Sequence, residues 1–123
     1  MIGYATLGSN DVARAAAFYD SLLGEIGATR FMESETFVGW SIAPDQPMIG
    51  VTVPYDGAAA TVGNGVMLAL SASSRADVDR LYAKAIELGG TDEGAPGDRG
   101  NGFYAAYFRD LDGNKLNFFT MAS

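Results

Sequence analysis

Hydrophobic and polar positions divide the first half of the chain into one amphipathic helix and four short strands. An apolar face recurs at helical spacing through Ala15, Phe18, Tyr19 and Leu22. Good N-cap residues stand before this segment, and a glycine at position 24 is expected to end it. The segments that read as strands are apolar, rich in β-branched or aromatic residues, and bounded by turn residues: 2–8, 26–31, 36–42 and 48–53.

The second half repeats this order. Residues 66–70 form an apolar run, and Ser74 with Asp77 fits a capping box at the start of a second helix. Gly89-Gly90 is expected to end that helix, and a glycine-rich loop over 94–102 then leads to the C-terminus. The apolar face of the helix is formed by Val78, Leu81, Tyr82, Ala85 and Leu88.

An offset of 63 positions superimposes the two halves. It places one cap residue, Asp11, on the other, Ser74, and it places Tyr4 on Met67. It also aligns the apolar helix positions, since Ala15 falls on Val78, Phe18 on Leu81, Tyr19 on Tyr82 and Leu23 on Ile86. Taken together, these matches predict a structural duplication in which Tyr4 and Met67 are equivalent.

The last strands are predicted to form a hairpin around Asp112-Gly113, because glycine takes the positive φ of a tight turn. Aromatic residues flank the turn in 103–108 and in 116–119. Alternation places Asn117 on the same face as residues 115 and 119. The run 110–114 also resembles part of a calcium loop, but its glycine comes too early and no Glu follows where one is required, so we favour the turn.

Composition then excludes several kinds of chemistry. The 123 residues contain neither Cys nor His, which removes disulfides, thiolate nucleophiles, zinc–thiolate sites and the commonest metal ligand. A net charge of −7 argues against a nucleic-acid partner. The chain has no apolar run long enough for a bilayer and no basic segment typical of a secretory signal at its start. A cytoplasmic protein without a membrane partner is therefore expected.

These motifs resemble the vicinal-oxygen-chelate superfamily, which includes glyoxalase I, bleomycin-resistance proteins and extradiol dioxygenases. The resemblance rests on Asp11 with residues 17–19, the three residues 63–65, the helix start 74–79, Gly89-Gly90 with residues 95–97 and Tyr104, and the run 110–116. It implies an α+β fold of two βαβββ modules that form a cupped mixed sheet with helices outside. One domain over 1–123 is expected, with modules at about 1–55 and 65–123 joined by a linker at about 54–64.

Family enzymes hold a divalent metal inside the cup through His or Glu side chains on four strands. Carried over by the resemblance, these positions fall at Tyr4, Gly50, Met67 and Asn117. None is a competent ligand for a divalent cation, because a thioether is weak, a neutral phenol must first ionise, and an amide brings no charge. The sequence therefore predicts no metal and no other cofactor.

The remaining hypothesis is a metal-free pocket for a small molecule, as in the bleomycin-resistance branch. The candidate binding residues are Tyr4, Phe37, Trp40, Gly50, Met67, Tyr104 and Asn117. The alternative for each is a structural role in the core or at a subunit interface. Acidic charge and abundant aromatic residues suit a cationic or flat ligand, and the resemblance implies a homodimer.

Two other classes stay open. One is a metal-dependent glyoxalase or dioxygenase, which the missing ligands disfavour, and the other is a degenerate fold retained for dimerisation. Without metal or histidine, catalysis would need an acid, base or phenol with a shifted pKa. The candidates Tyr4, Glu33, Glu35, Asp98 and Arg99 show no spacing that pairs any two of them, so no catalytic residue is predicted.

Overall fold

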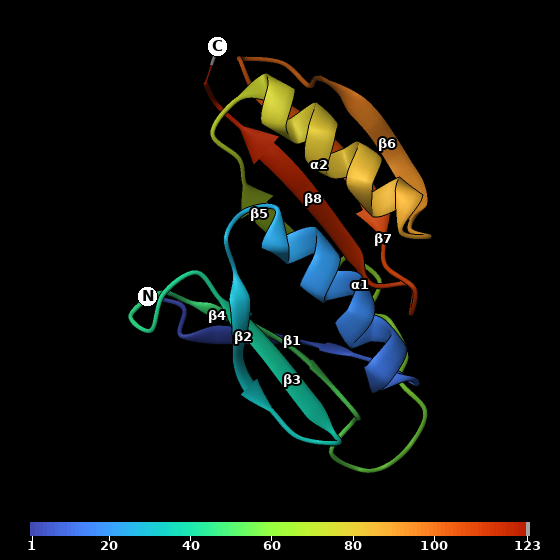
Figure 1. The fold of residues 1–123 in the computed structure, drawn as a ribbon. Coiled ribbons are helices and arrows are strands. Elements are labelled where there is room, and N and C mark those ends of the chain that lie inside the picture. Colours follow the sequence, from blue (N-terminus) through green and yellow to red (C-terminus); the bar gives the residue numbers. More distant parts are fainter. Residues whose placement is uncertain (123) are drawn as a thin grey trace. The chain divides into compact units, whose positions relative to one another are not determined.

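A computed structural model describes residues 1–122, which divide into two compact units, Met1–Val62 and a second unit from Gly63 onward. Each unit has the order strand, helix, three strands (Figure 1). The elements of the first are β1 (Tyr4–Gly8), α1 (Val12–Gly24), β2 (Thr29–Glu33), β3 (Phe37–Ser41) and β4 (Met48–Thr52). Those of the second are β5 (Leu68–Ser71), α2 (Arg75–Glu87), β6 (Thr91–Asp98), β7 (Tyr104–Arg109) and β8 (Lys115–Thr120).

The two sheets have the same topology. The first has the strand order β1-β4-β3-β2 and the second has the order β5-β8-β7-β6. In each sheet the first and last strands of the unit pair in parallel, and the other pairs are antiparallel. The α+β fold of two βαβββ modules is thereby confirmed, and an offset of 63 carries the bounds of α1 onto those of α2.

The predicted caps explain where both helices begin. The side chain of Asp11 accepts a hydrogen bond from the backbone N–H of Arg14, and the Ser74 hydroxyl accepts one from the N–H of Asp77. Each bond satisfies one of the N–H groups that the first turn of a helix leaves free. At the other end, α2 stops before Gly89, whose φ of 105° suits glycine.

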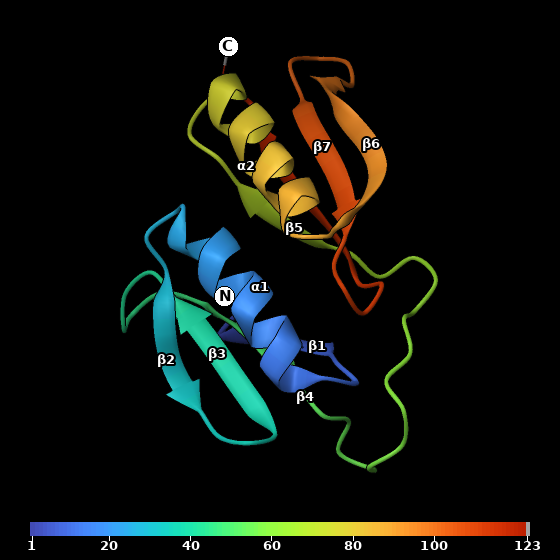
Figure 2. The same cartoon turned by 45° about the vertical axis from the view of Figure 1, so that its right-hand side comes forward.

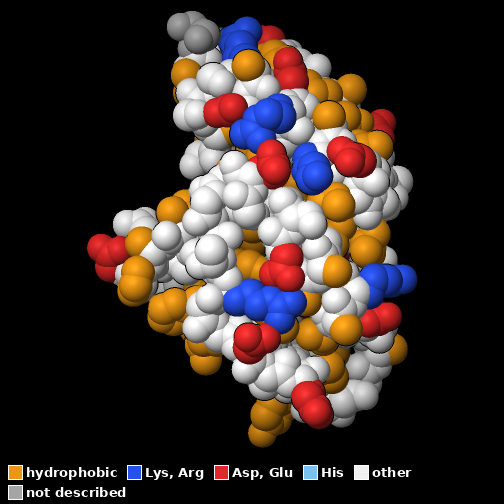
Figure 3. Space-filling view, in the orientation of Figure 1, with side chains coloured by type: hydrophobic (Ala, Val, Ile, Leu, Met, Phe, Trp, Pro, Cys, Tyr) orange, Lys and Arg blue, Asp and Glu red, His pale blue; other side chains and the backbone are white. Residues whose placement is uncertain are grey.

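Each helix covers one face of its own sheet, and we call the face turned away from the helix the open face. In the first unit, α1 packs against β3, where Tyr19 lies near Trp40, and Tyr19, Leu22, Val38 and Trp40 are all buried. In the second, α2 packs against β6, β7 and β8, where Phe108 and Phe118 stack with ring centroids 5.6 Å apart. Acidic and basic side chains are interspersed on the helices, without a patch of one sign (Figure 3).

The C-terminal hairpin forms as predicted, with Arg109 opposite Lys115. Gly113 has a φ of 87°, and the Asp110 carboxylate accepts hydrogen bonds from the backbone N–H groups of Asp112 and Asn114 at 2.9 Å. A further bond joins the Asn114 side-chain amide to Asp110 at 3.0 Å. Asp110 therefore stabilises the turn through hydrogen bonds within the chain.

Several strand boundaries differ from the sequence prediction, two of them by three residues or more. The second strand begins at Thr29 instead of position 26, because residues 25–27 complete a turn that ends on Gly27 with a φ of 83°. The expected loop over 94–102 is wrong in its first half, since β6 extends to Asp98. Irregular register around Gly94 and Gly97 lets glycine-rich backbone stay paired with β7.

Between Val53 and Met67 the chain has no helix or strand (Figure 2). Its first part is tied to the first unit by the Asn10 side chain, which accepts from the backbone N–H of Ala60 at 2.7 Å and donates to the Ala60 carbonyl at 3.3 Å.

Candidate functional site

The first unit carries a pocket of about 440 Å³ on the open face of its sheet. Most of its lining is apolar, and no lining side chain is charged. It is formed by Gly3, Tyr4, Phe31, Met32, Phe37, Ser41, Pro44, Gln46 and Met48. A volume in this range suits a small organic molecule.

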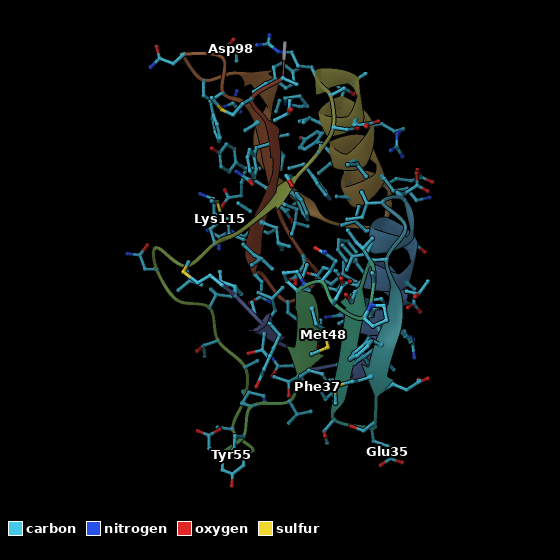
Figure 4. All side chains as sticks on the ribbon, turned by 90° about the vertical axis from the view of Figure 1, so that its left-hand side faces the viewer. Glu35, Phe37, Met48, Tyr55, Asp98 and Lys115 are labelled. Atoms are coloured by element: carbon cyan, nitrogen blue, oxygen red, sulfur yellow. The ribbon has the colours of Figure 1, made fainter. Side chains whose placement is uncertain are left out.

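Two glycines make room for the floor of this pocket. Gly39 and Gly50 are register partners at the centre of β3 and β4. A Cβ on Gly50 would collide with the Phe37 ring, and a Cβ on Gly39 would lie 2.5 Å from the Met48 sulfur. The Phe37 ring and the Met48 thioether therefore lie against backbone that carries no side chain, and Figure 4 shows Phe37 and Met48 close together on this sheet. The Gly50 backbone lies beneath the Phe37 ring, and glycine has no side chain that could contact a ligand.

A β-bulge forms one wall. The register between β2 and β3 shifts between Arg30 and Met32, so that two successive residues, Phe31 and Met32, both line the pocket. Each is about half exposed, at 52%. The sequence analysis missed both, because simple alternation would send neighbouring side chains to opposite faces.

The pocket contains polar groups that lack partners. Within the described residues, neither the Tyr4 hydroxyl nor the Gln46 side-chain amide makes a hydrogen bond. The Ser41 hydroxyl differs, because it donates to the Ala43 carbonyl at 2.6 Å and is used by the turn before β4. Tyr4 and Gln46 are thus the side chains able to orient a polar substituent of a ligand.

Trp40 lies on the opposite face of the sheet from Phe37 and does not line this pocket. Its side chain is 1% exposed and packs near Tyr19 of α1, with ring centroids 5.6 Å apart. The indole N–H donates to Asp20 at 2.8 Å, and Arg30 donates to the same carboxylate at 2.8 and 3.0 Å. Hydrogen bonds from Arg30, together with the one from Trp40, hold the pKa of Asp20 below its usual value although partial burial opposes this.

In the second unit, Tyr104 also lies on the helix side of its sheet. Its hydroxyl donates to Asp79 of α2 at 2.6 Å, and the Arg75 guanidinium lies 4.9 Å from its ring centroid. Because this hydrogen bond favours the neutral phenol, it raises the pKa of Tyr104, and desolvation adds to the shift. The aromatic wall expected from Tyr104 is therefore a contact between β7 and α2.

Asn117 lies on the open face of the second sheet, opposite Tyr107 in the β7–β8 register. Its side chain is 1% exposed, and its Oδ1 atom accepts no hydrogen bond. Met67, the remaining predicted residue, is 40% exposed and directly precedes β5. The structure thus brings Tyr4, Phe37 and Gly50 together in one unit and places Met67 and Asn117 in the other.

The positions that correspond to the family's metal ligands do not fit a divalent cation. Tyr4, Gly50, Met67 and Asn117 offer a phenol, no side chain, a thioether and a neutral amide. Across residues 1–122 no three Asp or Glu side chains come together in a group able to hold a metal ion. The chemistry of these donors gives no basis for a metal-dependent step.

Two repeated βαβββ units, each with a helix on one face of a mixed sheet, define the fold class, and comparison with known proteins identifies the family. The sequence profile of the Glyoxalase/Bleomycin resistance protein/Dioxygenase superfamily matches residues 1–118. The chain belongs to this superfamily. No curated protein matches it.

Solved structures agree with this assignment. A glyoxalase/bleomycin resistance protein from Albidiferax ferrireducens T118 shares 36% identity, with a TM-score of 0.88 and 97% of each chain covered. A hypothetical protein from S. aureus shares 28% identity, with a TM-score of 0.77, over 98% of this chain and 92% of the other. A lactoylglutathione lyase from Agrobacterium tumefaciens, at 21% identity and a TM-score of 0.73 over 97% and 92%, shares the fold.

The described part of the chain has no helix that is both long and apolar enough to cross a membrane.

Proposed function

We propose that this protein binds a flat, weakly polar organic molecule in the pocket of its first unit, without a metal. The observation that carries the proposal is the lining itself. Phe31 and Phe37 supply aromatic surface, Met32 and Met48 supply polarisable thioethers, and no charged side chain takes part.

The polar groups of the pocket narrow the ligand class. The Tyr4 hydroxyl can donate or accept a hydrogen bond, and the Gln46 amide can do both. A ligand with one or two neutral polar substituents would satisfy them at the rim while its ring lies against the apolar floor. The net charge of −7 also favours a cationic aromatic ligand over an anionic one at long range.

Methionine methyl groups give a direct test. The chain has five methionines, of which Met32 and Met48 line the pocket, whereas Met1, Met67 and Met121 do not. With ¹³C-methyl-methionine protein, titration with 2-naphthol and with N-methylquinolinium should shift the Met32 and Met48 signals saturably and leave Met121 unchanged.

A pair of variants controls for non-specific binding. Phe31→Ala removes aromatic surface from the pocket and should weaken 2-naphthol binding at least about fivefold. Tyr55→Ala removes a fully exposed ring outside the pocket and should leave the affinity unchanged. Figure 4 shows Tyr55 in the connection that follows β4, well away from Phe37 and Met48.

Chelation tests the metal-free part of the proposal. Protein treated with EDTA and then desalted should bind 2-naphthol with the same affinity, and elemental analysis of the purified protein should find no stoichiometric divalent metal. Stoichiometric metal together with loss of binding after chelation would favour a metal-dependent enzyme. If a broad aromatic panel produces no Met32 or Met48 shift and the protein is dimeric, the dimerisation scaffold becomes the better reading.

A further inference from the structure

On the open face of the second sheet, two cations lie close to the same tyrosine ring. The Arg99 guanidinium lies 5.6 Å from the Tyr107 ring centroid, and the Lys115 ammonium lies 5.4 Å from it. Lys115 and Tyr107 come from neighbouring strands, β8 and β7, and Arg99 follows the end of β6. Figure 4 shows Lys115 on the side of β8 that faces away from α2.

These two cations have no acidic partner, which sets them apart in this protein. Within residues 1–122, no carboxylate pairs with Arg99 or Lys115. The Arg99 side chain donates one hydrogen bond, to the Ala95 carbonyl at 2.6 Å. Ion pairs with Asp or Glu are formed instead by Arg30, Arg75, Arg80, Lys84 and Arg109. In a chain of net charge −7, two unpaired cations on one ring form a local positive site.

Asn117 adds an unsatisfied acceptor to the same place. It is the register partner of Tyr107, so both side chains share the open face. Its Oδ1 atom is buried and accepts no hydrogen bond, which is costly unless a donor is supplied from elsewhere. The Tyr107 hydroxyl likewise has no hydrogen-bond partner in the described chain.

We propose that this cluster binds a small hydroxycarboxylate. The carboxylate lies between Arg99 and Lys115, and a hydroxyl of the same ligand donates to the Asn117 oxygen. The side chains of Tyr107 and Lys115 are half-buried. When the ligand binds, these side chains change rotamer, and the ligand carboxylate replaces the ring as the partner of the cations. A monoanion fits better than a phosphate dianion, because only two cations face the site and the protein as a whole is acidic.

This site is separate from the aromatic pocket of the first unit and does not rest on it. The probes are glycolate, acetate and inorganic phosphate, added at constant ionic strength to ¹⁵N-labelled protein. Glycolate should shift the Asn117 side-chain amide and the Tyr107 backbone amide saturably. It should also bind about fivefold more tightly than acetate, which lacks the hydroxyl.

Matched variants test how much each cation contributes to glycolate binding. Lys115→Met should lower glycolate affinity about tenfold, and Arg99→Gln should have a similar effect. Lys84→Met removes the same charge from α2, where the lysine pairs with Glu87 at 3.9 Å, and should leave the affinity unchanged. Asn117→Ala should abolish the advantage of glycolate over acetate while acetate binding persists.

Three results would overturn the assignment. Glycolate shifts that do not saturate would mean non-specific ion binding. Equal losses in Lys115→Met and Lys84→Met would show that net charge alone matters. Tighter binding of phosphate than of glycolate would exclude a hydroxycarboxylate as the ligand class. Lys115 is half-buried at the start of β8, so its variant keeps the test valid even if Asn117→Ala fails to fold.

Discussion

The hydrogen bond between the Trp40 indole and the Asp20 carboxylate is a stabilising contact of the first unit that single substitutions can test. Trp40 is the single tryptophan of the chain, so its fluorescence reports on this unit. Its buried indole N–H donates to Asp20 at 2.8 Å, and the same carboxylate receives two hydrogen bonds from Arg30. Asp20→Ala removes both interactions, whereas Asp20→Asn keeps an oxygen that can accept from the indole.

The expected magnitudes follow from these contacts. Leaving a buried N–H without an acceptor costs about 1–3 kcal/mol, and we expect about 1.5 because the Asp20 side chain is 43% exposed and water can enter. Loss of the partly exposed ion pair with Arg30 adds about 0.5 kcal/mol. Alanine recovers about 0.5 kcal/mol through its better helix propensity in α1. The free energy of unfolding should therefore fall by about 1.5 kcal/mol in Asp20→Ala and by about 0.5 kcal/mol in Asp20→Asn.

Urea unfolding followed by tryptophan fluorescence measures both values. With a slope of about 1 kcal/mol per M, the midpoint should fall by about 1.5 M for Asp20→Ala and by about 0.5 M for Asp20→Asn. The same pair in a Trp40→Phe background, followed by circular dichroism, completes a double-mutant cycle. There alanine should be more stable than asparagine by about 0.5 kcal/mol, since no indole N–H remains and alanine keeps its better helix propensity. Equal destabilisation by Asp20→Ala in both backgrounds would refute the argument.

Two further predictions concern stability. Hydrogen bonds from Arg30 lower the pKa of Asp20 in the folded state, so the stability that this carboxylate adds is present above about pH 4 and is lost as the pH falls through the folded-state pKa. In urea titrations, the difference in the free energy of unfolding between wild type and Asp20→Asn should stay constant from pH 5 to 7 and shrink below pH 4. A difference that stays constant down to pH 2 would contradict this prediction. Gly90→Ala should cost about 1–3 kcal/mol, because its Cβ would lie 2.8 Å from the Ala85 carbonyl oxygen, whereas Gly24→Ala, with no atom within 4 Å, should be neutral or stabilising by circular dichroism. Equal stability of the two alanine variants would contradict it.

Much of the fold could be predicted from the sequence because its signals are local. Asp11 and Ser74 cap helices wherever the rest of the chain lies, and the turn at Asp112-Gly113 depends on its own few residues. The repeat at 63 positions then specifies two units of the same kind. The ends of strands were harder to predict where pairing with a neighbouring strand extends a strand into glycine-rich sequence, as in the second half of β6.

The face on which a strand residue lies could also be predicted, and the structure places two of the aromatic candidates, Trp40 and Tyr104, on the helix side of their sheets. In β3 the two-residue period puts Phe37 and Trp40 on opposite faces, so both could not line one pocket on this sheet. In β7 the same period separates Tyr104 from Tyr107, and the hairpin register assigns Tyr107 to the face of Asn117. The alternation within each strand is therefore enough to separate these aromatic residues by face.

The sequence by itself determined the family, the repeated unit and the absence of competent donors at the metal positions, because these depend on residue type and local spacing. Tertiary structure alone decided which side chains meet. The bulge that turns Phe31 and Met32 to one side, the glycine pair beneath Phe37, and the convergence of Arg99 and Lys115 on Tyr107 all depend on strand register. Register is set by pairing between segments distant in sequence, and local patterns do not specify such contacts.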